Sequence, residues 1–166
     1  MNFDEEFKNA LSKALDDGVE AQRKKNEIRS MMSEFASILS DILSKRYALP
    51  INVATNDVVI REAPSIWNLF SAGNLPEHER PIIATFDELR LSYNDPDAGH
   101  HYSKRICKLT VNAKSGYPCK IEYGQNCVFC NNADEVKSAV LGMVQDLGAF
   151  FNEIETEIKT KAINTN

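Results

Sequence analysis

The sequence lacks the glycine-rich loops and short catalytic motifs by which many enzymes are recognised. Its 166 residues include only seven glycines, none of them clustered, so a phosphate-binding cradle of backbone amides is not expected. No G-x-S-x-G, P-loop, dinucleotide-binding glycine fingerprint or kinase motif is present. These absences argue against enzymes of those classes, although a site assembled from distant residues would leave no such pattern.

Long hydrophobic runs and a basic leader are also absent. The opening segment 1–8 is acidic, and no uninterrupted apolar stretch follows it. A secretory signal would be basic and then apolar, and a membrane-spanning helix needs about 20 apolar residues. We therefore expect a cytoplasmic protein with no membrane association.

Positive charge is in deficit, since the formal net charge is −5. Such a chain has no general attraction for nucleic acid or anionic lipid. One basic segment, Arg23–Lys25 followed by Arg29, could contact phosphate groups. Glu20 and Glu27 lie within a helical turn of this segment, and ion pairs on a helix surface explain it equally well. We therefore expect no nucleic-acid partner.

Cysteine is sparse, with four residues in the chain. In a reducing cytoplasm such cysteines are packing residues or metal ligands more often than crosslinks. Two of them form the C-x-x-C of the segment GQNCVFCNNADEV, which covers residues 124–136. The pattern has three interpretations: a zinc site completed by Cys107 and Cys119, a redox pair, or thiols packed in a β-sheet.

The alternation of side chains along strands distinguishes these interpretations. A two-residue turn at Gly124–Gln125 would place Cys130 opposite Cys119 on the face that turns to the core. Cys127 is an odd number of residues from Cys130 and therefore points to the other face. The ligands of one zinc ion converge, and this C-x-x-C encloses two strong strand formers rather than a tight turn. We therefore predict buried thiols and no metal.

The segment Asn94–His101 is the richest in candidate metal ligands. We predict that it is a loop between strands that carries two carboxylates and two imidazoles: Asp95, Asp97, His100 and His101. Such side chains can bind a divalent metal. The spacing of a calcium loop is absent, and Asn, Asp, Pro and Gly are ordinary residues of a solvated turn. We predict that the chain binds no metal and no other cofactor. In the alternative hypothesis, this loop is the metal site.

Residues 1–48 are predicted to form a helical region. Large apolar residues recur at every fourth position from the start: Phe3, Phe7, Leu11 and Leu15. Asp17 and Glu20 match the pattern of a helix start, so we predict a break or bend near Gly18. A second helix is predicted over 19–47. Its apolar face follows alternating steps of three and four: Ile28, Met31, Phe35, Ile38 and Ile42.

The middle of the chain is rich in β-branched residues and turn signals. We predict a strand over 51–60, with a hairpin folded at Asn56–Asp57 as the alternative. A short helix is predicted over 64–73 and contains Trp67, which we expect in an interface or in the core. After a loop over 75–81, further strands are predicted: 82–93, 102–111, 117–123 and 126–130.

The last predicted helix begins at a capping box, Asn132–Glu135, and runs to about residue 161. Its apolar residues step by four and three in alternation: Val136, Val140, Met143, Leu147, Phe150 and Ile154. About thirty residues of helix extend ~45 Å, whereas a typical strand extends only ~17 to 20 Å. The helix is therefore expected to outrun the sheet and to contact the apolar stripe over 28–43.

These elements together predict an α+β fold. It consists of N-terminal helices, a mainly antiparallel meander of four to five strands, and a long C-terminal helix packed on the sheet and on the N-terminal helices. We predict a coiled-coil-like region over 1–48 and an α+β domain over 49–166, which fold as one cooperative unit. The apolar faces of the predicted helices have more surface area than one small sheet can cover. We therefore expect a helical bundle closed within the chain or by a second copy, with a homodimer preferred.

We interpret the chain as a small, non-catalytic, cytoplasmic interaction protein, such as an adaptor, inhibitor, immunity-type protein or chaperone. It would bind a protein partner through helical faces. The expected interface residues are Ile28, Phe35, Ile42, Trp67, Phe150, Phe151, Ile154 and Ile158. The alternative hypothesis is a metal-dependent nucleic-acid-binding or nuclease-like protein that uses the 94–101 loop or the cysteines. A hydrolase with a dispersed site is a third hypothesis.

Overall fold

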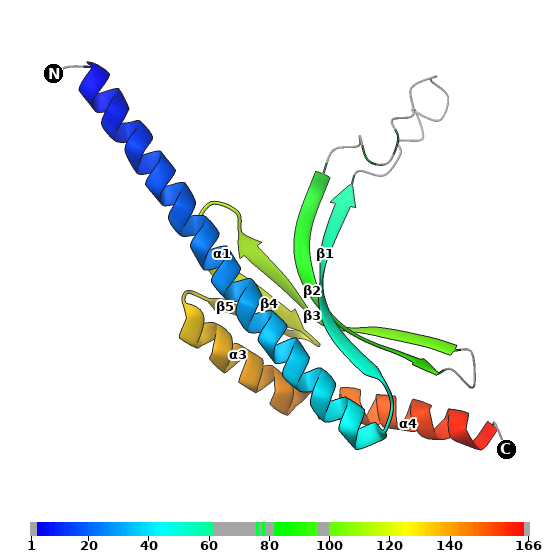
Figure 1. The fold of residues 1–166 in the computed structure, drawn as a ribbon. Helices are drawn as coiled ribbons and strands as arrows, with labels where there is room; N and C mark the ends of the chain where they lie inside the picture. The colour runs from blue at the N-terminus through cyan, green and yellow to red at the C-terminus, as the bar shows by residue number, and fades with distance from the viewer. Residues whose placement is uncertain (1–2, 62–75, 77, 79–81, 96–99, 165–166) are drawn as a thin grey trace.

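The computed structural model describes residues 3–61, 76, 78, 82–95 and 100–164. One long helix precedes an antiparallel sheet, and two helices follow it (Figure 1), so the predicted α+β class is confirmed. The helices are α1 (Phe3–Tyr47), α3 (Ala133–Asp146) and α4 (Gly148–Asn164). The strands are β1 (Ile51–Arg61), β2 (Ile82–Asp95), β3 (His100–Asn112), β4 (Gly116–Tyr123) and β5 (Asn126–Cys130). The short helix predicted over 64–73 lies outside the described residues.

Helix α1 is continuous over 45 residues, so the predicted break near Gly18 is wrong. A single glycine lowers helix stability by only up to ~1 kcal/mol relative to alanine. The helical residues on both sides of Gly18 can offset that cost. Arg23 supports the helix just beyond this point with two hydrogen bonds to Glu20, both of 2.8 Å. The helix ends where Ala48 adopts a positive φ of 52°, and Pro50 follows.

The five strands form one antiparallel sheet in sequence order, from β1 at one edge to β5 at the other. The predicted antiparallel meander is therefore confirmed. β1 pairs with β2 over its whole length, from Ile51 opposite Tyr93 to Arg61 opposite Ile82. The alternative of a hairpin at Asn56–Asp57 is wrong, because both of these residues pair directly with β2 within a single strand.

Tight turns set the register of the last three strands. A turn at 113–115 joins β3 to β4. Gly124–Gln125 joins β4 to β5, and Gly124 has the positive φ of 54° that this turn favours in glycine. The turn places Cys119 opposite Cys130, as the sequence predicts.

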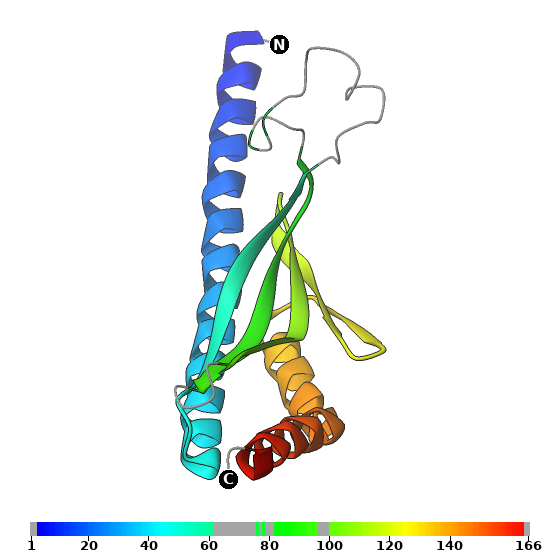
Figure 2. The same cartoon turned by 90° about the vertical axis from the view of Figure 1, so that its right-hand side faces the viewer.

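The C-terminal region forms two helices separated by Leu147, so the predicted long C-terminal helix is matched only in part. α3 begins after the cap Asn132, whose Oδ1 accepts a hydrogen bond of 2.9 Å from the backbone N–H of Glu135. It ends at Asp146 with Leu147 as its C-cap, and α4 begins at Gly148. Figure 2 shows α4 running at an angle to α3. The change of direction places both Leu147 and Ile154 in the core, whereas one straight helix would carry its second half past the sheet.

One hydrophobic core lies between the sheet and the helices (Figure 2). Buried residues alternate along the strands, as at Leu89 and Leu91, because one face of the sheet turns toward the helices. α1 contacts β1 and β4, and α3 contacts β5 and α1. α4 is joined to β3 through Lys104, whose ammonium pairs with Glu153 and lies 5.2 Å from the ring centroid of Phe150.

The first part of α1 extends beyond the sheet (Figure 1). The 45 residues of this helix span about 67 Å, which is longer than any strand of the sheet. Every residue from Phe3 to Val19 is exposed. This segment, residues 3–20, is named the α1 arm. Its exposed large apolar residues are Phe3, Phe7, Leu11, Leu15 and Val19.

Candidate functional site

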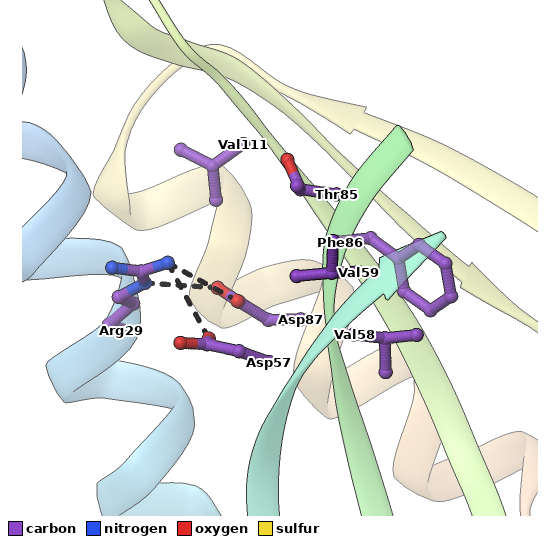
Figure 3. Close-up of a pocket in the computed structure, with 8 residues that line it drawn as sticks. All are labelled: Arg29, Asp57, Val58, Val59, Thr85, Phe86, Asp87 and Val111. Carbon is purple, nitrogen blue, oxygen red and sulfur yellow. Dashed lines mark hydrogen bonds and ion pairs between the residues drawn. The ribbon is translucent and has the colours of Figure 1, made fainter. Parts of the chain in front are cut away.

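A polar pocket lies between α1 and the sheet, and its charged residues come from three elements (Figure 3). Arg29 of α1 donates two hydrogen bonds to the carboxylate of Asp87 on β2, of 3.1 and 3.3 Å. A terminal nitrogen of Arg29 also lies 3.6 Å from a carboxylate oxygen of Asp57 on β1. The remaining lining residues are mostly apolar: Val58, Val59, Thr85, Phe86 and Val111.

The register of the sheet places the two carboxylates side by side, because Asp57 and Asp87 are directly opposite each other. Asp87 is only 8% exposed. Burial raises the pKa of Asp87, and the hydrogen bond and charge of Asp57 act in the same direction. Arg29 opposes the increase by pairing with the ionised form, and its own pKa is raised by Asp87. The pocket therefore holds one cation between two acids.

This cluster ties α1 to the sheet, because the guanidinium of Arg29 lies against the carboxylate of Asp87 and also pairs with Asp57 (Figure 3). Local sequence patterns do not reveal the cluster, because Arg29 belongs to a basic segment and Asp57 to a turn signal. Only the register of β1 on β2 brings these residues together, and no local motif signals it.

Replacing Asp57 with asparagine is expected to relieve repulsion between the facing carboxylates. Like charges directly opposite on a sheet cost roughly 0.2 to 1 kcal/mol, so the variant should be more stable than the wild type by about 0.5 kcal/mol at neutral pH. Because the pKa of Asp87 is raised in the folded state, wild-type stability should fall as pH rises above the ordinary value of 3.8. The fall should be shallower in the variant. Urea unfolding at a series of pH values measures both effects.

Asp16→Asn is the matched control for that experiment, because it removes an exposed carboxylate from the α1 arm. Its stability should follow the wild-type pH profile. If Asp57→Asn also followed the wild-type profile, Asp57 would not contribute to the raised pKa of Asp87.

The cysteines lie on the faces that the sequence predicts. Cys119 and Cys130 face each other in the core, and Cys127 is exposed. Burial raises the pKa of Cys107 and of Cys119 to about 12. Both groups are therefore thiols at neutral pH, which disfavours the reactive thiolate that redox chemistry requires.

In the 94–101 segment, the alternative metal site, the described residues Asn94, Asp95, His100 and His101 lie in strands. β2 continues to Asp95 and β3 begins at His100, and these two residues pair across the strands. His101 is exposed, and its Nδ1 lies 2.7 Å from Oδ1 of Asn94. Asp97 lies outside the described residues. Among the residues that the structure describes, no group of three or more His, Cys, Asp or Glu side chains could hold a metal ion.

The predicted interface residues occupy different environments. Ile28 and Ile154 are fully buried within the core of the chain, whereas Ile42 is 56% exposed. Trp67 and the side chain of Ile158 lie outside the described part of the structure. Three aromatic residues pack partly against the core: Phe35, Phe150 and Phe151.

An apolar groove with a volume of about 330 Å³ lies between α1 and α3. It is named the α1–α3 groove. Ile38 and Leu141 flank it and are largely exposed. The lining residues are Met31, Glu34, Phe35, Ile38, Val136, Lys137, Val140 and Leu141. The apolar periodicity of both helices signals these residues, but only the fold shows that they share a groove.

Comparison of the chain with protein-family models, with curated proteins and with solved structures gave no match. In the described ranges, no helix has the length and apolar character needed to cross a membrane. The proposed function therefore depends on the surfaces of the molecule.

Proposed function

We propose that this chain is a small, non-catalytic, cytoplasmic interaction protein that binds other proteins through its helical faces and forms a homodimer. The observation that carries the proposal is the apolar surface of α1 that its own core does not cover. This surface has two parts, the α1 arm and the α1–α3 groove. Exposed apolar patches of this kind mark interaction sites.

The α1 arm suits self-association. Phe3, Phe7 and Leu11 are exposed by 75%, 58% and 50%, and full burial of such a side chain stabilises an interface by about 1.5 to 3 kcal/mol. The stripe repeats at every fourth residue, which is the row that forms a ridge on a helix surface. Two identical ridges can interdigitate as crossed helices. A homodimer through this stripe would be self-complementary.

The α1–α3 groove suits an amphipathic helix of a protein partner. Such a helix presents apolar residues at steps of three and four, which fit a groove between two helices. Met31 and Phe35 supply adaptable apolar contacts from α1, and Val140 supplies one from α3. Glu34 and Lys137 line the same groove, so polar groups on the partner can set its orientation.

Two double variants test the two surfaces separately. Phe7→Gln with Leu11→Gln makes the arm polar, and Ile38→Gln with Leu141→Gln makes the groove polar. Glutamine is chosen as the replacement because it is a good helix former. Light scattering measures self-association, and capture from native lysate measures binding to partners. The matched controls place glutamine at exposed polar positions of the same helices: Asn9→Gln with Ser12→Gln, and Ser30→Gln with Ser138→Gln.

The arm variant is expected to have the mass of a monomer, whereas the wild type and both controls have the mass of a dimer. The groove variant should remain a dimer and lose at least roughly tenfold in the recovery of captured partners, which corresponds to about 1.4 kcal/mol. A monomeric wild type would contradict the homodimer. Equal capture by the groove variant and its control would contradict the assignment of the groove.

A further inference from the structure

The outer edge of β1 is open to another strand. β1 is the first strand in the sheet order, so β2 is its one neighbour among the strands that the structure describes. At the start of β1, the backbone N–H and C=O groups of Ile51 point away from β2 and toward α1. Its carbonyl accepts hydrogen bonds of 2.7 and 2.9 Å from the hydroxyls of Ser40 and Ser44, and its N–H donates to Ser44 at 3.1 Å.

The direction of Ile51 fixes the direction of the residues that follow. In an antiparallel strand, the N–H and C=O of one residue point to the same side, and the side alternates from residue to residue. Val53 and Thr55 therefore direct their backbone groups to the outer edge, while Ala54 directs its groups to β2. Within the described part of the chain, no hydrogen bond reaches those outward groups of Val53 and Thr55.

A groove follows this open edge. It has a volume of about 310 Å³ and lies between α1 and residues 52–55 of β1. The wall formed by α1 consists of small residues and one acid: Ser33, Ala36, Ser37, Ser40 and Asp41. Unpaired backbone groups next to a groove are the arrangement by which some domains bind an extended peptide between a helix and an edge strand.

We propose that β1 binds an extended peptide segment of another protein as a sixth strand of the sheet, between β1 and α1. The outward groups of Val53 and Thr55 would form hydrogen bonds with the peptide backbone. This site is separate from both surfaces of the proposed function. A second copy of the chain fits less well, because α1 overlaps the edge at Ser40 and Ser44. In a dimer paired through β1, the two α1 helices would compete for the same space.

The lining of the groove indicates the chemistry of the peptide. A strand places alternate side chains on one face, so every second peptide side chain would meet the small serine and alanine residues of α1. These small residues leave room for β-branched or larger side chains on the peptide. Among the lining residues that the structure describes, Asp41 is the one that carries a charge. It favours a basic residue at one end of the segment and disfavours an acidic one.

Selection from a library of random twelve-residue peptides displayed on phage tests the site, with the full-length chain as bait. Thr55→Pro removes an outward N–H and leaves the hydrogen bonds between β1 and β2 in place, since proline is tolerated on edge strands. Thr55→Val is its control, because valine keeps the N–H. Ser37→Phe fills the groove from α1, and Ser37→Ala is the corresponding control. Melting curves confirm which variants are folded.

Selected peptides should bind the wild type and both controls and bind Thr55→Pro and Ser37→Phe at least roughly tenfold more weakly. Amide exchange at Val53 and Thr55 should slow on binding, while exchange at Ala54 stays unchanged. If Thr55→Pro does not fold, Ser37→Phe with its control decides the outcome. The proposal is overturned if no peptide is enriched on the wild type over Ser37→Phe, or if the selected peptides bind both proteins equally.

Discussion

Replacing Gly116 with alanine should destabilise the protein by about 3 kcal/mol, because two penalties apply at one position. Gly116 has a φ of 78°, and a residue with a Cβ atom pays about 1 to 2 kcal/mol for this left-handed conformation. A Cβ atom at Gly116 would also lie 2.6 Å from Cβ of Lys24 on α1. Relieving such overpacking costs about 1 to 3 kcal/mol. Urea unfolding should show the loss, and the melting temperature should fall by about 6 to 12 °C.

Gly124→Ala provides the matched control, because Gly124 also has a positive φ, of 54°, but no atom lies within 4 Å of the position of an added Cβ. It should pay only the conformational penalty, about 1 kcal/mol. The difference between the two variants therefore measures how closely the β3–β4 turn packs on α1. Equal losses would mean that α1 does not hold this turn in solution.

The pairing of β4 with β5 could be predicted from sequence because two independent constraints select one register. Side-chain alternation requires the buried residues of both strands to share a face. A two-residue turn that starts with Gly124 then allows a single alignment, in which Cys119 meets Cys130. The same alternation separates the exposed Cys127 from the buried Cys130, and no knowledge of the rest of the fold is needed.

Helix ends were less predictable, because apolar periodicity does not show where a helix must change direction. Asp17 and Glu20 match a helix start beside Gly18, and no such pattern surrounds Gly148, yet α1 continues through Gly18 while a helix ends shortly before Gly148. Near Gly18 the side chains of the arm are exposed, so no contact favours a bend there. Near Gly148 the burial of Leu147 and Ile154 favours the bend. Tertiary packing therefore overrides the local signal at both positions.

The Arg29 cluster and the open edge of β1 could not be predicted for a shared reason. Both depend on β1 being one long strand, whereas the pair Asn56–Asp57 indicates a turn by local rules. In the structure, Asp57 is held in the strand by its pairing with β2 and faces Arg29. Strand pairing and a long-range ion pair are therefore formed at Asp57 in place of the local turn. These contacts exist only once α1 and the sheet are packed together.

Replacing Ile154 with aspartate should destabilise the whole chain by about 4 to 5 kcal/mol. Ile154 is fully buried and belongs to the same core cluster as residues of α1 and the sheet. The substitution removes a large apolar side chain from this core and introduces a carboxylate that has no partner there. Urea unfolding followed by circular dichroism measures the loss, which should leave a single transition at lower urea concentration.

Leu141→Asp is the matched control, because it introduces the same charge at a position on α3 that is 66% exposed. Substitutions at such positions usually change stability by less than about 0.5 kcal/mol. Amide exchange distinguishes loss of the whole core from local release of α4. If Ile154→Asp increased amide exchange only in α4 and the urea midpoint of unfolding remained near that of Leu141→Asp, α4 would be a separately folding attachment. If protection fell together in α4, α1 and the central strands, the single core formed by both ends of the chain would account for the result.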